Sequence, residues 1–332
     1  MSDISAKRAA SEWQLQKPYS LKTAIVILLI IILLPISGKN VEIDKGIRET
    51  VGAVGAIFGY GESGVASSVK SFIEKCFPPV FHSETEINRI KDFDPNDLPW
   101  FSHIETRKVR NYNALTDSWA ESESRYLVNP VGYALRVGWK MLETIEMAIW
   151  GTILSLVVAI PLAYFGAKNL TPGKFLYVIA RGVSSFNRSI PDIIFALFFV
   201  LMYGFGPLAG ILSLGVHTSG FLGKFFADEI ENADPNTQEA LASRGANKIQ
   251  VLRYAILPQV MPQIFSYVQY ILERNVRMAT VLGIVGAGGI GMELKGRWDM
   301  FNYAHVTTVL LAIFVVVVAL EYVTQRLRAR LF

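Results

Sequence analysis

The sequence predicts an all-α polytopic membrane protein with six transmembrane helices and a large extracytoplasmic insertion. Three observations lead to this fold class: charge is scarce, apolar residues gather in long runs, and many of the charges lie in one segment. Only 18% of the 332 residues are charged, against roughly 25% in soluble domains. Segment 39–140 alone holds 27 of the 60 charged residues. The distribution argues against a plain globular enzyme, and a net charge of +4 is too small to indicate a nucleic-acid partner.

The first apolar run covers residues 22–36 and follows a basic N-terminus. A membrane helix needs about 20 mostly apolar residues, so a run this short is also compatible with a signal peptide. The exit of the run offers no good pair of small residues for cleavage. We therefore expect residues 1–38 to form a cytoplasmic N-terminus and a retained first helix, with cleavage as the open alternative.

Five further apolar runs predict the remaining spans, at about 143–167, 190–203, 208–230, 262–285 and 303–322. The polar stretch 175–189 is expected to lie along the membrane interface. Residues 141–332 would thus form a core of five spans.

The orientation follows from the short loops, because cytoplasmic loops carry an excess of Lys and Arg. With the N-terminus inside, the inner segments hold 14 Lys and Arg residues, whereas the short outer segments hold only Lys295 and Arg297. Both termini are therefore expected in the cytoplasm, and segment 39–140 outside.

That outer segment carries 13 basic and 14 acidic residues and no repeat. Residues 44–75 could form amphipathic helices at the membrane surface. For residues 77–130, a small cap and a poorly ordered loop are equally open.

Several motifs resemble enzyme or nucleotide sites without completing them. The run 286–291 fits G-x-G-x-x-G, but Val306 stands where a ribose-binding acid would be. The glycines at 59–64 have phosphate-loop spacing, but Val65 and Ala66 replace the lysine and the hydroxyl residue. The four histidines are dispersed and Cys76 is the one cysteine. We expect no catalytic residue, metal or cofactor on this chain, although a membrane enzyme remains an alternative.

The loop 231–262 has the signals of a helix–turn–helix. Asp234 precedes a proline and predicts the start of a helix over 235–244, which Gly245 would end as a left-handed cap. Asn247 and Gln250 resemble a capping box that starts a second helix at 248. Pro258 is expected to end that second helix.

In this loop the sequence Glu239-Ala240-Leu241-x-x-x-Gly245, followed by Leu257-Pro258, resembles the EAA motif of ABC-importer permeases. Leu241 replaces the second alanine of the motif and Ala255 the usual isoleucine. The resemblance implies a coupling helix that docks on an ATPase subunit, with five contributing residues: Glu239, Ala240, Gly245, Leu257 and Pro258.

Other segments resemble the phosphonate/phosphite-type (PhnE-like) permeases: Leu142-Glu143-Thr144, Arg188-Ser189-Ile190-Pro191-Asp192, 215–224 and 276–291. The resemblance covers about 130–332. It implies the methionine-importer-like fold, a homodimer in the bacterial inner membrane, two ATPase subunits that bind ATP and Mg, an extracytoplasmic solute-binding protein and an oxyanion substrate. Glycines at the outer mouth could form a gate: Gly286, Gly288, Gly289 and Gly291.

Arg274 and Arg277 lie about 18–23 Å along the fifth predicted span, at 1.5 Å per residue. A central arginine costs at least about 2.5–3.5 kcal/mol there, so such residues usually face a bundle interior or a water-filled path. Pairing of Arg277 with Glu273 is the alternative. The hypothesis is an anion path that involves Arg274, Arg277, His217 and Arg188.

Two rival functions remain. A permease for another small solute, such as an amino acid, would share the coupling loop. A secondary transporter should carry ion-coupling carboxylates in its spans and inverted repeats, and apart from Glu273 we find neither.

Overall fold

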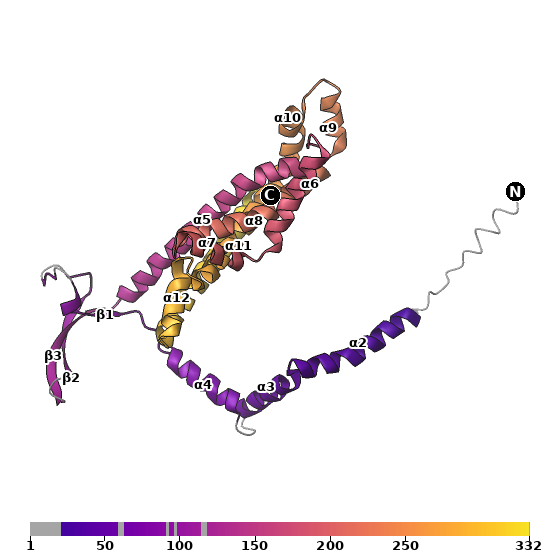
Figure 1. Cartoon of the computed structure of the whole chain (residues 1–332). Coiled ribbons are helices and arrows are strands. Elements are labelled where there is room, and N and C mark those ends of the chain that lie inside the picture. Colours follow the sequence, from indigo (N-terminus) through magenta and orange to yellow (C-terminus); the bar gives the residue numbers. More distant parts are fainter. Residues whose placement is uncertain (1–20, 59–62, 91–92, 96–97, 114–117, 332) are drawn as a thin grey trace, which may run out of the picture. The chain divides into compact units, whose positions relative to one another are not determined.

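The structure is a computed structural model that describes residues 21–331, apart from 59–62, 91–92, 96–97 and 114–117 (Figure 1). The predicted cytoplasmic N-terminus and most of the glycine run 59–64 therefore lie outside the described residues. The chain divides into two units, residues 1–74 and 75–332.

The first unit consists of helices. The apolar run forms α2 (Leu21–Asn40), which contains no acidic residue and is long and apolar enough to span a membrane. Helices α3 (Ile43–Ile57) and α4 (Gly64–Cys76) follow, the latter reaching into the second unit. The amphipathic helices expected over 44–75 are thus confirmed as helices. Retention of α2 stays a prediction.

Residues 83–129 form a three-stranded antiparallel sheet in place of a loop. Strands β1 (Ser83–Glu86), β2 (His103–Asn113) and β3 (Ser118–Asn129) adopt the order β1-β3-β2, and a short 3-10 helix, η1 (Ile87–Arg89), follows β1. The all-α prediction was wrong for this segment. In the structure, exposed and half-buried residues alternate over 104–110, the period of two that strands require, but the residues there do not alternate between apolar and polar types. Arg107 of β2 also links the two edge strands, since its guanidinium donates to the Glu84 carboxylate of β1 at 2.9 Å.

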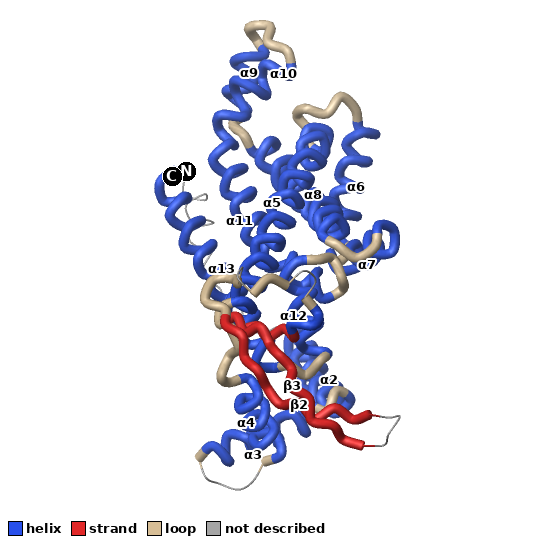
Figure 2. The backbone as a smooth tube through the Cα atoms, turned by 90° about the vertical axis from the view of Figure 1, so that its left-hand side faces the viewer, coloured by secondary structure: helices blue, strands red, loops and turns tan. Residues whose placement is uncertain are grey.

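The rest of the second unit is a helical bundle. Its long helices are α5 (Gly132–Gly166), α8 (Pro207–Asn232), α11 (Leu257–Ile284) and α13 (Tyr303–Leu331). Shorter helices complete it: α6 (Lys174–Ser189), α7 (Asp192–Tyr203), α9 (Pro235–Ala242), α10 (Lys248–Val251), the π-helix η2 (Leu252–Ile256) and α12 (Gly289–Asp299). Helices α5 and α8 lie side by side through the centre (Figures 1 and 2).

Small side chains line the contact between these two helices. Gly151 of α5 lies against Leu214 of α8, and Gly215 of α8 lies against Leu154 of α5, so that a Cβ at either glycine would collide. Large apolar residues such as Val157 and Ile160 are instead 63% exposed. A polar solvent would oppose this pattern, whereas membrane helices associate through small residues and leave large apolar ones to the lipid.

Four helical stretches are long and apolar enough to cross a membrane, or up to five if the bent pair α6–α7 counts as one span. The six spans therefore remain a prediction. The expected third span at 190–203 is only the 12-residue α7, about 18 Å long and too short to cross alone. Helix α6, which was expected to lie along the membrane interface, runs beside α8. The axis of α7 makes an angle of 89° with that of α6 (Figure 2).

Candidate functional site

The helix–turn–helix predicted for loop 231–262 is confirmed in its caps and its turn. The Asp234 carboxylate accepts a hydrogen bond from the backbone N–H of Asn236 at 3.0 Å and caps α9. These bonds hold the pKa of Asp234 below its ordinary value. Gly245 has φ +86°, the left-handed conformation that glycine adopts without strain. Asn247 and Gln250 form a reciprocal capping box at the start of α10.

The predicted helix end at Pro258 was wrong. Residues 248–299 form one stretch of nearly continuous helix, in which the π-turn η2 leads directly into α11. Pro258 occupies the first turn of α11, where its missing N–H costs little. The wider π-turn before it accommodates the ring without breaking the helix.

The loop presents an accessible surface. Glu239, Ala240, Gly245 and Pro258 are exposed, and Leu257 is half-buried. Two apolar side chains that the sequence reading missed, Ile249 and Tyr254, are 66% and 62% exposed. Exposed apolar groups on a short, well-capped helical hairpin are typical of a surface that another protein covers.

An ion-pair network behind the loop joins the ends of α5 and α8 to the middle of α6. Arg181 of α6 donates from Nε to the Gly166 carbonyl oxygen at 2.7 Å, and its other nitrogens bind Asp228 at 2.5 Å and Glu231 at 3.0 Å on α8. Glu231 also accepts from the Lys168 backbone N–H at 2.8 Å. Because α8 leads directly into the loop, this network anchors the loop to the bundle. The sequence reading counted Arg181 only as a cytoplasmic charge.

A second link reaches the loop from the α5–α6 connection. Asn169 donates to the Ile230 carbonyl oxygen at 2.9 Å and to Gln238 of α9 at 3.2 Å. Lys248 of α10 donates to the Thr171 carbonyl oxygen at 3.2 Å. The hairpin is therefore held at both of its helices.

The structure places His217 and Arg274 together in a polar cluster in the bundle. Nη2 of Arg274 lies 3.0 Å from Nε2 of His217, and Nδ1 of His217 lies 2.8 Å from the Ile190 carbonyl oxygen. A carbonyl can only accept, so Nδ1 carries the proton and Nε2 accepts from the guanidinium. His217 is thus neutral in this arrangement, while Arg274 carries the charge.

Asp192, at the start of α7, is the carboxylate of this cluster. Its Oδ2 lies 3.7 Å from Nη2 of Arg274, an ion-pair distance without a hydrogen bond. Nη1 of Arg274 is also buried without a hydrogen-bond partner among the described residues. Buried polar atoms normally find partners, so these two point to a group that the chain alone does not provide. The signal in the sequence was an acid at the head of an apolar run.

Arg188 reaches the same cluster through an aromatic ring. Its Cζ lies 5.8 Å from the centre of the Phe221 ring, and Cζ of Arg274 lies 4.9 Å from the same centre. No acidic partner is found for Arg188 within the described part of the chain. With two arginines, one carboxylate and a neutral imidazole, the cluster has a formal charge of +1.

Arg277 does not join the cluster. Its guanidinium pairs with Glu273 at 2.6 Å, and its side chain is 44% exposed. The alternative that the sequence left open, an ion pair one turn apart, is what the structure shows for this residue.

The glycine segment 286–291 is a buried, tightly bonded turn between α11 and α12. The helix α11 precedes it, so the strand that a dinucleotide site requires is absent among the described residues. Gly286 and Gly288 have φ values of +97° and +87°. The Gly289 N–H donates to the Glu143 carboxylate at 3.0 Å, and the Ile290 N–H donates to the Thr144 hydroxyl at 2.8 Å. The four glycines are brought together, and whether they act as a gate remains untested.

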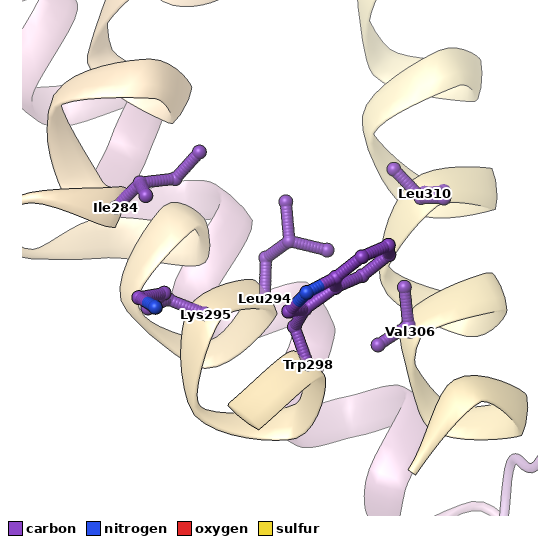
Figure 3. A pocket seen from close by; sticks show the side chains of 6 residues that line it. All are labelled: Ile284, Leu294, Lys295, Trp298, Val306 and Leu310. Atoms are coloured by element: carbon purple, nitrogen blue, oxygen red, sulfur yellow. The ribbon is translucent and has the colours of Figure 1, made fainter. Parts of the chain in front are cut away.

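An apolar pocket of about 320 Å³ lies between α12 and α13 (Figure 3). Trp298 extends from α12 toward Val306 and Leu310 of α13, and the ammonium of Lys295 pairs with Asp299 at 2.7 Å. The pocket lacks converging polar groups. Among the described residues no group of three or more His, Cys, Asp or Glu side chains could hold a metal ion.

A bundle of apolar helices with a charged centre and an exposed helical hairpin defines a multi-pass membrane permease. Residues 159–331 match the family described as binding-protein-dependent transport system inner membrane component. The chain belongs to this family, and it is a permease component of a transport system.

Three relatives carry names that concern phosphorus oxyanions. The phosphite transport system permease HtxE of Stutzerimonas stutzeri is 48% identical over 259 residues, which cover 77% of this chain and 99% of HtxE. The phosphite transport system permease PtxC of the same organism is 40% identical, covering 57% of this chain and 68% of PtxC. The phosphate-import permease PhnE of Mycolicibacterium smegmatis is 38% identical, covering 58% of this chain and 36% of PhnE.

Solved structures share the fold. The inward-facing MetNI methionine ABC transporter matches with a TM-score of 0.53 and 22% identity, covering 59% of this chain and 96% of the matched chain. A crystal structure of an amino acid ABC transporter with histidines gives a TM-score of 0.52 and 15% identity, covering 60% and 96%. The predicted methionine-importer-like fold of the core is thus confirmed.

Proposed function

We propose that this chain is the permease subunit of an ABC importer that moves a phosphonate- or phosphite-like oxyanion across the cytoplasmic membrane. The observation that carries the proposal is the near-complete coverage of HtxE at 48% identity, because the name of that protein specifies phosphite transport. The names of PtxC and PhnE specify phosphite and phosphate, which are oxyanions of phosphorus as well.

The charge of the central cluster supports an anionic substrate. Nη1 of Arg274 is buried without a partner among the described residues, and Arg188 adds a second guanidinium beside Phe221. Guanidinium groups match the oxygens of a phosphoryl-type anion, and in a low-dielectric bundle their attraction is stronger than in water. The residues proposed for the anion path are Arg274, His217 and Arg188, with Arg277 as a weaker member because it is already paired.

The loop 231–262 is proposed to couple transport to ATP hydrolysis on a separate subunit. The surface proposed to dock on that subunit includes the exposed Glu239, Ala240, Ile249 and Tyr254. Arg181 would carry a displacement of that surface to α5, α6 and α8. The proposed assembly contains a second copy of this chain, two ATPase subunits with ATP and Mg, and an extracytoplasmic solute-binding protein, with both termini of this chain in the cytoplasm.

The test is uptake by membrane vesicles that contain the chain with its ATPase and binding protein. Phosphite and methylphosphonate should be accumulated only when ATP is supplied inside, and methionine should not be. Uptake driven by an ion gradient without ATP would favour the secondary-transporter alternative. ATP-driven uptake of an amino acid, without uptake of phosphite or methylphosphonate, would support the ABC-importer class and contradict the proposed oxyanion substrate.

A further inference from the structure

Two adjoining cavities lie at the end of the bundle where helices α5 and α13 begin. One is polar and the other apolar, which is the combination that an amphiphilic ligand requires. The first, which we term the head pocket, has a volume of about 280 Å³ and is polar; its main lining residues are His82, Glu84, Tyr133, Arg136, Arg297 and His305. The second, the apolar groove, has a volume of about 510 Å³ and lies between α5 and α13. Its lining includes Val137, Met141, Ile145, Leu311, Ala312 and Val315.

The linings of the two cavities adjoin along three segments of the chain. Phe81 lines the groove and His82 the head pocket. On α5, Ala134 of the groove stands next to Tyr133 of the pocket, and on α13, Thr308 of the groove follows His305 by one turn. The groove extends along α5 from residue 134 to 145, about 16 Å at 1.5 Å per residue. Half of a hydrocarbon core is about 15 Å, so the groove has the depth of one leaflet.

Three side chains that line the head pocket contact one another. The guanidinium of Arg297 lies 4.9 Å from the centre of the Tyr133 ring, and the His305 ring meets the same ring edge-on at 4.6 Å. Tyr133 is 2% exposed, and its buried hydroxyl has no hydrogen-bond partner in the described part of the chain. A buried hydroxyl without a partner indicates a missing ligand or water.

The charges in the head pocket leave one cation unmatched. Glu84 is bound by Arg107 through two hydrogen bonds of 2.9 and 3.0 Å, Arg107 also donates to Glu105 at 2.6 Å, and Glu293 is bound by Arg297 at 2.8 Å. Arg136 lines the pocket without any ion pair or hydrogen bond among the residues that the structure describes. Arg136 is therefore the group of this pocket that can bind an anion.

We propose that the head pocket and the apolar groove together bind an anionic phospholipid, with its phosphate at Arg136 and one acyl chain between α5 and α13. A guanidinium binds a phosphate group through charge-assisted hydrogen bonds, and burial of an acyl chain in the apolar groove is favourable. Helix α2 is a less suitable occupant, because it contains no acidic residue to offer Arg136. The proposal does not depend on the transported substrate.

The test is native mass spectrometry of the purified full-length chain titrated with phosphatidylglycerol or phosphatidylcholine. The wild type should bind phosphatidylglycerol roughly fivefold more tightly, about 1 kcal/mol for a partly exposed charged contact. Arg136→Gln should remove this preference and leave phosphatidylcholine binding unchanged. Lys174→Gln, at the opposite end of the bundle, should keep the preference.

A second pair of variants tests the groove. A side chain at Gly138 meets nothing within 4 Å, so Gly138→Phe should fill the groove and weaken both lipids, while Gly182→Phe, equally open on α6, should not. Equal affinity for the two lipids in the wild type, or an intact preference in Arg136→Gln, would overturn the proposal. A thermal shift with inorganic phosphate alone that Arg136→Gln abolishes, without any lipid preference, would assign the pocket to a soluble oxyanion instead.

Discussion

Arg274 donates to Nε2 of His217 across 3.0 Å, and the same imidazole is held through Nδ1 by the Ile190 carbonyl oxygen at 2.8 Å. This contact links α8 and α11 to the junction between α6 and α7. It keeps the imidazole neutral and fixes the guanidinium, whose Nη1 has no partner in the part of the chain that the structure describes. An arginine oriented in this way can meet an anion without first reorganising.

Arg274→Gln should therefore reduce oxyanion uptake at least about tenfold, since a charge-assisted contact in the bundle contributes about 1.5–3 kcal/mol. Uptake by reconstituted vesicles measures the effect, and size-exclusion chromatography checks the fold. The matched control is Arg277→Gln on the same helix, which removes an exposed, paired charge and should change uptake by less than about threefold. Full uptake by a folded Arg274→Gln variant would contradict the role of the cluster.

Gly245→Ala should weaken the docking loop, because a Cβ in the left-handed conformation costs about 1–2 kcal/mol. Gly245→Asn is the control, since asparagine tolerates this conformation. Nothing else obstructs either side chain, as no atom lies within 4 Å of a Cβ at this position. The measurement is co-purification of the ATPase subunit, which should fall for Ala more than for Asn. If both variants retained the ATPase subunit equally, the conformation of the turn at Gly245 would not determine docking.

Gly288→Ala should destabilise the bundle. Its φ is +87°, and a Cβ there would lie 2.8 Å from the backbone nitrogen of Pro207. Gly296→Ala on the following helix meets nothing within 4 Å and should be neutral or slightly stabilising. Thermal unfolding in detergent compares the two variants. A normal midpoint for Gly288→Ala would show that the turn is pliable enough to move as a gate.

The Asp234 cap should give α9 a pH dependence. Its pKa is lowered in the folded loop because the carboxylate accepts from Asn236 and Thr237. A lowered folded-state pKa means that the stabilisation is fully present above the unfolded value of about 3.9 and is lost as pH falls through the folded value. Amide-exchange protection factors of residues 235–242 should thus drop below about pH 4. Asp234→Asn, which caps without a charge, should remove this dependence.

Arg181→Gln should lower the stability of the loop end of the bundle by about 1–3 kcal/mol, because Asp228 and Glu231 lose their partly buried partner. Lys174→Gln on the same helix is a control at an exposed position. Unfolding midpoints in detergent measure the difference. Indistinguishable midpoints for the two variants would show that the network is not what anchors the loop.

The loop was predictable because its signals are local. A cap such as Asp234 and a left-handed glycine such as Gly245 depend on residues within one or two turns. The continuation of the helix through Pro258 could not be predicted, because packing against the bundle decides the π-turn before it. Ala255 and Ile256 in that turn are almost fully buried. Local preference favoured a break, and burial favoured continuity.

The candidate site was predictable only in part. The depth of Arg274 and Arg277 follows from counting residues along a helix, but the direction of each side chain does not. Arg274 faces α8, whereas Arg277, nearly one turn away, pairs on the surface with Glu273. Contacts over long sequence separations, such as Arg181 with Asp228 and Gly289 with Glu143, have no local signal at all.

The most direct test of the central claim is the uptake of radiolabelled phosphite by vesicles that contain this chain, its ATPase and its binding protein, with and without internal ATP. We expect ATP-dependent accumulation that unlabelled methylphosphonate reduces and methionine leaves unchanged, and that Arg274→Gln lowers at least tenfold. Phosphite accumulation that proceeds without ATP, or ATP-driven transport that excludes phosphite and methylphosphonate, would contradict the account.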